Sequence, residues 1–275
     1  MLFKRRIKIG ISSDSDTRIF DERLEITVRV SKDIQTDEAD TCEIDIINLS
    51  PESRAFIGTA KTVAVKLGYH ESETTVFIGD IMNVIHRKRP MEWVTSIKAG
   101  DKGISLQTAT MNHTYIGKTK LEDTLKDLAT STETELEIIG DKSFAQAALP
   151  KGKSYTLSSQ EHLRQIAKEH KLDWSIQDGV LVIGRKESHR EKQPILLNYS
   201  SGLLNSPETD YDDKTKTNRL RAISLLNSAF RPGDSVVIES AALKEGKVLV
   251  NMKQVVFNAN SRLGEFTSAI EGEIL

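Results

Sequence analysis

The stretch "RLEITVRVS", residues 23–31, predicts how the first hundred residues fold. Leu24, Ile26, Val28 and Val30 alternate with polar residues, which is the period of a strand with one buried face. Comparable runs follow at similar spacing: "TCEIDIINL" (41–49), "TVAVKLGY" (62–69), "TTVFIGDIMNVIHRK" (74–88) and "EWVTSIKAG" (92–100). Short strands at this spacing predict a small antiparallel barrel or sandwich.

Two helices are expected in the middle of the chain, where the hydrophobic period lengthens. In "TKLEDTLKDLATS", Thr119 is expected as the N-cap and Glu122 follows three residues later, as in a capping box. Ser158 and Glu161 give the same arrangement at the start of "SSQEHLRQIAKEH". Both segments place apolar side chains along one helical face.

A tight hairpin is expected directly after the second helix. Asp178-Gly179 stands between two apolar runs in "LDWSIQDGVLVIG", which is a strong local signal for such a turn. Together with the helices, this hairpin predicts a small α/β insert made of two helix-then-strand units. The plan of the chain is therefore β, then small α/β, then β.

The last third of the chain returns to β character from about Gln193. A polar loop is expected between Pro207 and Thr217, followed by a strand in which Leu220, Ala222 and Ser224 share one face. A comparable break is expected near the start of the chain, where the proline of "NLSPES" (48–53) ends a strand.

The stretch "SLLNSAFRPGDSVVIES", residues 224–240, contains the turn Arg231-Pro232-Gly233-Asp234. Pro232 presets the φ of the first central position, and Gly233 can take the positive φ that a type II turn requires at the second. Arg231 and Asp234 are expected on the rim of the turn and not as reacting groups. The turn is interpreted as a corner between two strands.

Composition sets the class of the protein. A chain of 275 residues is long enough for two or three compact units. Hydrophobic residues make up 38%, charged residues 28%, and the formal net charge is -2, which favours a soluble globular protein without nucleic-acid recognition. The basic start "MLFKRRIKIG" lacks the apolar run of a signal peptide, and no segment approaches the roughly 18 to 20 apolar residues of a membrane span. Synthesis in the cytoplasm, without membrane insertion, is expected.

Gly117-Lys118-Thr119 is similar to the end of a phosphate-binding loop, where a lysine and a hydroxyl residue follow a glycine in this order. Asn112 stands where the motif requires its first glycine, so the backbone cradle is not expected to form. Thr119 is better explained as the helix cap.

Metal binding is not expected from the histidines or from the acidic run. Zinc hydrolases use two histidines four residues apart on a helix, with a glutamate between them. No pair among the six histidines has this pattern; they are His70, His86, His113, His162, His170 and His189. Asp210, Asp212 and Asp213 lack the glycine and distal glutamate of a calcium-binding loop, and lysines stand close by. A solvated charged loop is predicted.

No catalytic residue can be nominated. Cys42, the only cysteine, lies on an alternating strand and is predicted to pack in the core. The basic run "HRKRP", residues 86–90, has no interleaved aromatic residue, so a solvated loop or a protein interface is predicted. No catalytic, cofactor-binding or metal-binding residue is therefore assigned, and the residues favour a β-rich binding or structural protein.

Several segments, in their order, resemble the hub proteins of contractile phage tails, the family that includes late control D proteins and the central baseplate hub. The resembling pieces are "VFIGDIMNVIH" (76–86), "IKAGDKGISLQTATMNHTYIGKTKLEDTLKDLA" (97–129), "EHLRQIAKEHKLDWSIQDGVLVIG" (161–184), "GLLNSPE" (202–208) and "SLLNSAFRPGDSVVIES" (224–240). This likeness extends over most of the chain.

The resemblance implies a mainly β fold with two tail-tube-like antiparallel β-barrel domains, the second one discontinuous and interrupted by a small α/β domain. The implied ranges are 1–95 for the first barrel, 96–117 and 190–275 for the second, and 118–189 for the insert. It also implies a homotrimeric ring that adapts a hexameric tail tube to a trimeric central spike. The implied partners are the tail tube protein, the central spike protein, other baseplate proteins and the tape measure protein, and the implied location is the virion tail baseplate.

Two other functions stay open from the sequence. The insert is not unlike small peptidoglycan-binding units, which suggests a cell-wall or glycan-binding module of a phage or phage-like particle. A hydrolase is the third possibility, because carboxylates distant in sequence can meet in a fold. The sequence does not separate a phage from a phage-derived contractile particle.

Overall fold

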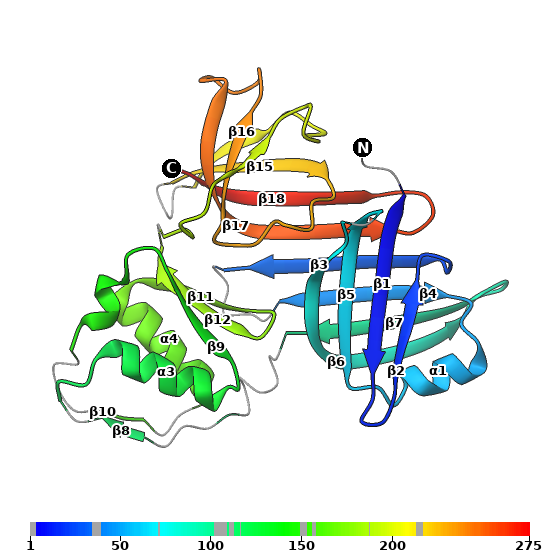
Figure 1. Ribbon diagram of the computed structural model, residues 1–275, viewed down its shortest axis with the longest axis horizontal. Coiled ribbons are helices and arrows are strands. Elements are labelled where there is room, and N and C mark those ends of the chain that lie inside the picture. The colour runs from blue at the N-terminus through cyan, green and yellow to red at the C-terminus, as the bar shows by residue number, and fades with distance from the viewer. Residues whose placement is uncertain are drawn as a thin grey trace.

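A large β-sheet and a smaller α/β insert make up the chain (Figure 1). The computed structural model describes residues 4–34, 40–70, 72–101, 109, 113–115, 117–148, 153–155, 158–186, 188–212 and 217–275. The large sheet has 13 strands: β1 (Arg5–Ser12), β2 (Thr17–Asp21), β3 (Ile26–Asp33), β4 (Thr41–Ile47), β5 (Thr62–Tyr69), β6 (Thr74–Lys88), β7 (Trp93–Gly100), β13 (Ile195–Leu197), β14 (Glu208–Asp212), β15 (Thr217–Leu225), β16 (Ser235–Glu239), β17 (Lys247–Asn260) and β18 (Phe266–Ile274). The prediction of a mainly β chain with an α/β insert is confirmed.

The strands of the large sheet are joined in one continuous order, β14-β15-β18-β17-β3-β4-β7-β6-β5-β1-β2, with β16 on β17 and β13 on β16. All of these pairs are antiparallel except β13 with β16. The early and late parts of the chain meet where β3 pairs with β17. Within the described residues, no strand pair closes this sheet into a barrel.

The insert has its own three-stranded sheet, its own helices and its own core. Its elements are β8 (His113–Tyr115), α3 (Leu121–Ser131), β9 (Glu135–Ile139), the short 3-10 helix η1 (Lys142–Gln146), β10 (Lys153–Tyr155), α4 (Ser159–His170), β11 (Leu172–Gln177) and β12 (Val180–Arg185). β12 pairs with β11 antiparallel and with β9 parallel. Leu125, Leu163 and Trp174 are buried in one cluster that contains residues of both helices and of the sheet.

The local signals of the insert are mostly confirmed. Ser158 accepts a hydrogen bond from the Glu161 backbone N–H at 3.3 Å, so the predicted cap of α4 forms. Asp178 and Gly179 take φ values of 54° and 85° in the hairpin turn between β11 and β12. The predicted Thr119 cap is wrong, because Lys120 occupies the N-cap position of α3 and offers no side-chain cap.

Two segments predicted as irregular are regular. Strand β4 ends at Ile47, before the break expected at Pro51, and Pro51 instead begins helix α1 (Pro51–Ile57). The first turn of α1 is capped by Ser50, which accepts from the Ser53 N–H. Glu208–Asp212, expected as part of a polar loop, forms strand β14, because it pairs with β15 along its whole length. Of the remaining loop, residues 213–216 lie outside the described part of the chain.

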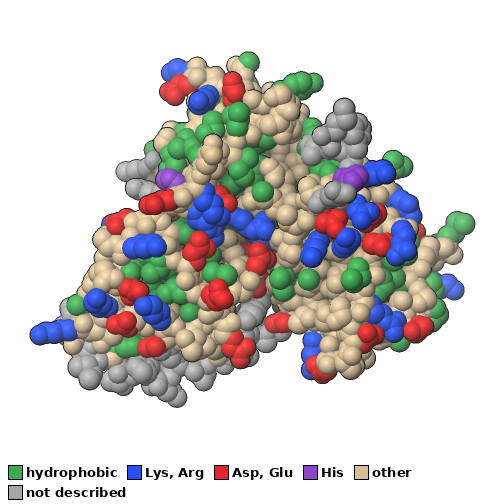
Figure 2. All heavy atoms as spheres, viewed as in Figure 1, with side chains coloured by type: hydrophobic (Ala, Val, Ile, Leu, Met, Phe, Trp, Pro, Cys, Tyr) green, Lys and Arg blue, Asp and Glu red, His purple; other side chains and the backbone are tan. Residues whose placement is uncertain are grey.

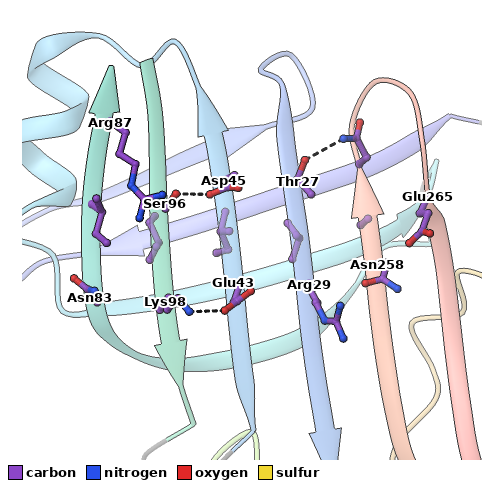
Figure 3. A pocket seen from close by; sticks show the side chains of 16 residues that line it. Thr27, Arg29, Glu43, Asp45, Asn83, Arg87, Ser96, Lys98, Asn258 and Glu265 are labelled. Carbon is purple, nitrogen blue, oxygen red and sulfur yellow. Dashed lines mark hydrogen bonds and ion pairs between the residues drawn. The ribbon is translucent and has the colours of Figure 1, made fainter. Parts of the chain in front are cut away.

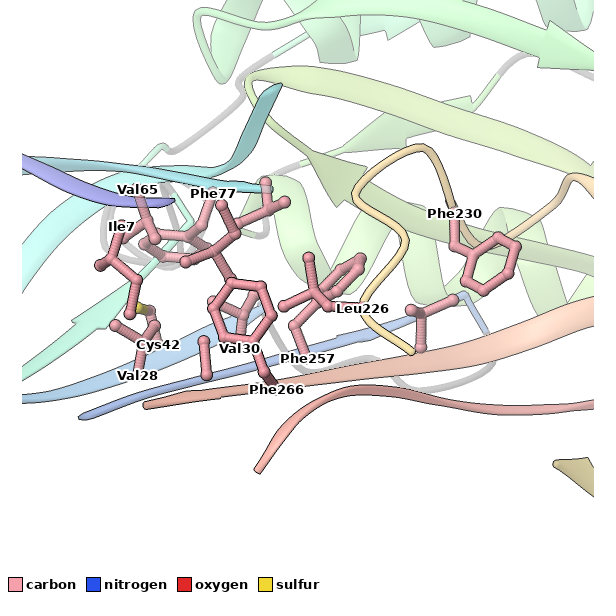
Figure 4. Packing of buried hydrophobic residues seen from close by; sticks show 14 of the residues in the cluster. Ile7, Val28, Val30, Cys42, Val65, Phe77, Leu226, Phe230, Phe257 and Phe266 are labelled. Carbon is pink, nitrogen blue, oxygen red and sulfur yellow. The ribbon is translucent and has the colours of Figure 1, made fainter. Parts of the chain in front are cut away.

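The core of the large sheet extends across the β3–β17 pair. Val28 and Val30 of β3 are buried with Phe257 of β17 and Phe77 of β6 in a single hydrophobic cluster (Figure 4). Cys42 lies in the same cluster, fully buried, so its predicted packing role is confirmed. Because one cluster serves strands from both ends of the chain, the two parts of the sheet are held together by shared packing as well as by hydrogen bonds.

Candidate assembly surface

The large sheet contains the same five-strand arrangement twice. In the first repeat, β3 to β7 lie in the spatial order β3-β4-β7-β6-β5. In the second, β14 to β18 lie in the order β14-β15-β18-β17-β16. Each strand of one repeat therefore has a counterpart at the same place in the other, in chain order and in space.

Matching irregularities set the alignment of the two repeats. The β6–β7 pair shifts register between Ile81 and Asn83, and the β17–β18 pair shifts between Met252 and Gln254. One extra residue, Met82 or Lys253, therefore occupies a bulge at the same place in each repeat. β-bulges bend a strand and increase its local twist, so the two repeats bend at equivalent points.

Cross-strand pairs next to the bulges also correspond. Lys98 on β7 lies opposite Glu43 on β4, with their charged atoms 2.7 Å apart. Glu271 on β18 lies opposite Arg221 on β15, at 2.8 Å. The two ion pairs occupy the same place in their repeats, with the charges exchanged.

A polar groove of about 630 Å³ crosses the strands of the first repeat and continues onto β17. One row of directly opposite residues crosses five strands: Asn83, Lys98, Glu43, Arg29 and Asn258. Figure 3 shows this row and a second one beside it, in which Ser96 is hydrogen-bonded to Asp45 at 2.5 Å. The rows run without interruption from the first repeat to the second.

The chemistry of the groove fits contact with another macromolecule better than catalysis. Its charged side chains balance, with Arg29, Arg87 and Lys98 against Glu43, Asp45 and Glu265. Lys98 and Glu43 are paired with each other and are 62% and 55% exposed, so neither is a desolvated acid or base. Figure 2 shows the same mixture of acidic and basic side chains over the face that it presents.

Two buried lysines from the large sheet hold the insert. Lys32 on β3 is fully buried, and its ammonium contacts the carboxylate of Asp178 in the β11–β12 turn. Lys253 on β17 is 4% exposed and lies 3.3 Å from Asp173 on β11 and 3.7 Å from Glu273 on β18. The insert is therefore attached where the two repeats meet.

A buried arginine fixes the predicted turn at residues 231–234 against the insert. Arg190 donates to the Pro232 carbonyl at 2.7 Å and to Asp234 at 3.2 Å, and it holds both carboxylate oxygens of Glu137 at 2.9 Å. This bidentate guanidinium holds the pKa of Glu137 below its usual value.

The predicted backbone of the turn is confirmed, because Gly233 has φ +88° and the Asp234 N–H donates to the Arg231 carbonyl at 3.1 Å. The predicted rim position of Asp234 is wrong: its side chain is buried against Arg190. Arg231 is partly buried, and it donates to the Thr75 carbonyl at 2.7 Å.

Carboxylates around Lys32 have unusual pKa values. Burial raises the pKa of Asp101 to about 7, although nearby Lys32 opposes the shift. Burial also raises the pKa of Asp40 well above its ordinary value, again against Lys32. Lys32 therefore faces the buried Asp40 and Asp101 and the partly buried Asp178, where the insert meets the large sheet.

The residues of the phosphate-loop, calcium-loop and basic-run motifs lie in separate elements of the structure. Gly117 and Lys118 form a turn before α3, and no part of a phosphate cradle is seen in the described residues. Asp210 lies on β14, and Asp213 falls outside the described part of the chain. The basic run begins within strand β6 and not in a loop, because residues 86–88 pair with β7.

Sequence reasoning missed the anchoring residues Lys32, Lys253 and Arg190. Lys32 carried a signal, because it continues the buried positions of Val28 and Val30 at a spacing of two. No comparable signal marks Arg190, which follows the insert in a segment without regular structure.

Nowhere in the described ranges do three or more His, Cys, Asp or Glu side chains gather as a metal ion would require. No helix in those ranges is both long enough and apolar enough to cross a membrane.

Comparison with known proteins places the arrangement among tail proteins. A family model described as "Baseplate hub gp41" matches residues 6–211. The fold is similar to the 43 kDa tail protein of prophage MuSo2 from Shewanella oneidensis (TM-score 0.68, 8% identity, covering 97% of this chain and 98% of that one). It is similar to a tail protein from Neisseria meningitidis MC58 (TM-score 0.69, 12% identity, covering 98% of this chain and 97% of that one). It is also similar to the c3393 protein of E. coli, a type VI secretion component (TM-score 0.66, 12% identity, covering 91% of this chain and 73% of that one). No curated protein matches the chain.

Proposed function

The chain belongs to the baseplate hub gp41 family, and from this premise we propose that it forms a homotrimeric ring joining a hexameric tail tube to a trimeric central spike. It is a structural component of a phage tail baseplate. In the proposed ring, one face contacts the tail tube protein and the other contacts the spike, with further baseplate proteins and the tape measure protein as neighbours.

The internal repeat carries this proposal. Three chains with two similar five-strand units each supply six similar units around an axis. Such a ring offers near-sixfold repetition to the tube, while the chains themselves repeat three times. The corresponding bulges and ion pairs support the similarity of the two units, because they preserve local geometry as well as strand order.

We propose further that each unit is a tube-like domain. The first contains β3 to β7 and therefore extends to Gly100, past the expected limit at residue 95, because β7 pairs with β4 and β6. The second contains β14 to β18 within residues 190–275, and 118–189 is the insert. The uninterrupted pairing of β3 with β17 then serves as the connection between neighbouring domains of the ring. In this proposal, the open sheet of one chain is completed by its neighbours.

The mass of the assembled protein tests the proposal. Native mass spectrometry of the full chain, alone and with its tube and spike proteins, is expected to give three copies, and electron microscopy of particles is expected to show one ring between tube and spike. A chain that stays monomeric with both partners present at high concentration would contradict the ring.

Cell-wall binding, the alternative function, has its own test. Sedimentation of the full chain with purified peptidoglycan is expected to leave the protein in the supernatant. Saturable co-sedimentation, abolished by soluble glycan fragments, would favour a binding role for the insert. We assign the protein no catalytic role, in keeping with the structural family to which it belongs.

A further inference from the structure

Two strand edges of the large sheet lack a partner in the described part of the chain and carry opposite charge. The half of β6 that follows Asp80 pairs with β7 on one side, whereas β5 ends its pairing at Asp80 on the other. This half ends in the basic residues 86–89. Strand β14 pairs only with β15, and it carries the exposed acids Glu208 and Asp210.

The internal repeat indicates what these two edges would pair with. β17 is the counterpart of β6, and its corresponding half, after the bulge, pairs with β3. β3 is in turn the counterpart of β14. The contact that joins the two repeats within a chain can therefore be formed a second time, between β6 of one chain and β14 of another.

Residue registers fix which side chains would meet. Aligning the bulges matches Arg87 with Asn258, because each stands five residues after its bulge residue. The two corresponding ion pairs match Glu43 with Arg221. They therefore also match Arg29 with Glu208, because Arg29 lies opposite Glu43 and Glu208 lies opposite Arg221. Within the chain, Asn258 lies directly opposite Arg29.

We propose that β14 of one copy pairs antiparallel with the second half of β6 of the next copy, with Glu208 directly opposite Arg87. This inference rests on the proposed ring and deepens it by naming the interface between copies. Three such contacts alternate with three β3–β17 contacts, so the sheet continues around the ring.

The side chains at the two edges are suited to this contact. Arg87 and Glu208 are both exposed, and neither forms an ion pair with another described residue of its own chain. Opposite charges placed directly across two strands stabilise their pairing. Covering both edges also removes strand edges that would otherwise template aggregation.

Two large exposed side chains, one on each strand edge, support the same register. The positions that match the buried lysines Lys32 and Lys253 hold Tyr211 and Met82, which are 52% and 61% exposed. In the proposed register, Tyr211 lies opposite Val84 of the next copy, as Lys32 lies opposite Val255 within the chain. The contact would therefore cover large apolar side chains that are otherwise in water.

Exchanging the charges of Arg87 and Glu208 tests the contact between β6 and β14. Arg87→Glu and Glu208→Arg are each expected to raise the dissociation constant of the ring at least tenfold, and the double variant is expected to return it to within about threefold of the original value. Matched circular dichroism and melting curves check folding, because both positions are exposed. Equal effects without rescue in the double variant would overturn the pairing.

Disulfide trapping tests the register. The double variant Arg87→Cys, Glu208→Cys is expected to give covalent dimers and trimers under oxidising conditions, because directly opposite strand residues lie within disulfide reach. Lys88→Cys with Glu208→Cys is the control, since a shift of one residue turns the side chain to the other face. Cys42 is fully buried and is not expected to cross-link.

The outcomes separate this inference from the proposed function. If the unmodified chain forms a trimer but the Arg87→Cys, Glu208→Cys variant does not cross-link, the ring stands and the β6–β14 contact is wrong. If neither trimers nor cross-links form, alone or with tube and spike proteins, the ring itself is contradicted. Cross-linking of the shifted control to the same extent would also overturn the proposed register.

Discussion

The Lys32 ammonium nitrogen lies 2.8 Å from both carboxylate oxygens of Asp178, a residue 146 positions away in the sequence. Lys32 belongs to the strand that joins the two repeats, and Asp178 belongs to the turn at the tip of the insert hairpin. This ion pair therefore connects three parts of the molecule: both repeats and the insert.

Removing the lysine is expected to destabilise the chain. Lys32→Met leaves the buried Asp40 without its cation and leaves Asp178 with only the more distant Arg231, at 3.8 Å, which should lower the free energy of unfolding by about 3 kcal/mol. Urea unfolding followed by tryptophan fluorescence measures the loss. Lys32→Met combined with Asp178→Asn should recover part of it, and a loss no larger than that of Lys98→Met, at an exposed ion pair, would contradict the anchoring role.

Stability is expected to fall as pH rises through the range in which Asp101 titrates. The pKa of Asp101 is about 7 in the folded chain and 3.8 ordinarily, so the folded chain keeps a proton that the unfolded chain releases. Between these values stability should decrease by up to about 1.4 kcal/mol per pH unit from this group.

Asp101→Asn is expected to flatten this pH dependence between pH 5 and 7, roughly the upper part of that range. Melting temperatures at several pH values give the comparison, with Asp14→Asn, at an exposed loop, as the control for the same change of charge. Parallel pH profiles for the Asp101 variant and the unmodified chain would show that Asp101 does not keep its proton.

Gly233→Val is expected to loosen the contact between turn and insert. A side chain at φ +88° is strained by about 1–2 kcal/mol. Its Cβ would also lie 3.2 Å from Ile139 Cδ1 and 3.3 Å from Arg190 Nη1. Gly246→Val is the matched control, with φ +70° and open space around it. Gly233→Val should therefore lower the free energy of unfolding more than Gly246→Val does. Equal losses of stability in the two variants would mean that backbone strain alone explains the effect.

Cys42 is expected to resist thiol reagents in the folded protein. Its side chain is fully buried in the core, and burial raises the pKa of the thiol, so little thiolate is available. Reaction with a chromogenic disulfide should occur only after denaturant is added. Stoichiometric labelling of the native chain would contradict the packing described for β4.

The strands of the first repeat could be predicted because their alternation is local. Val28 and Val30 show it directly, and the same holds for the Asp178-Gly179 hairpin, whose turn chemistry is contained in two residues. Helix α1 was missed although Ser50 and Pro51 are typical of a helix start, because the proline was interpreted only as a strand breaker.

The assembly surface could not be predicted in the same way, because its pairs are distant in sequence. Arg29 and Asn258 lie opposite each other only because β3 pairs with β17, and no local pattern specifies that choice. Strand β14 was missed because Glu208 and Asp210 interrupt any apolar alternation, and the strand is recognisable only through its pairing with β15.

The insert follows the first repeat in the sequence and precedes the second. Its lysine anchors stand on β3 and β17, the strands that meet inside each chain. In a ring of three chains, every second boundary between neighbouring units would thus bear an insert, and the boundaries between chains would bear none. The inserts would therefore mark three of the six nearly equal positions around the ring. A threefold partner can then distinguish alternate positions and seat in one of three equivalent orientations instead of six.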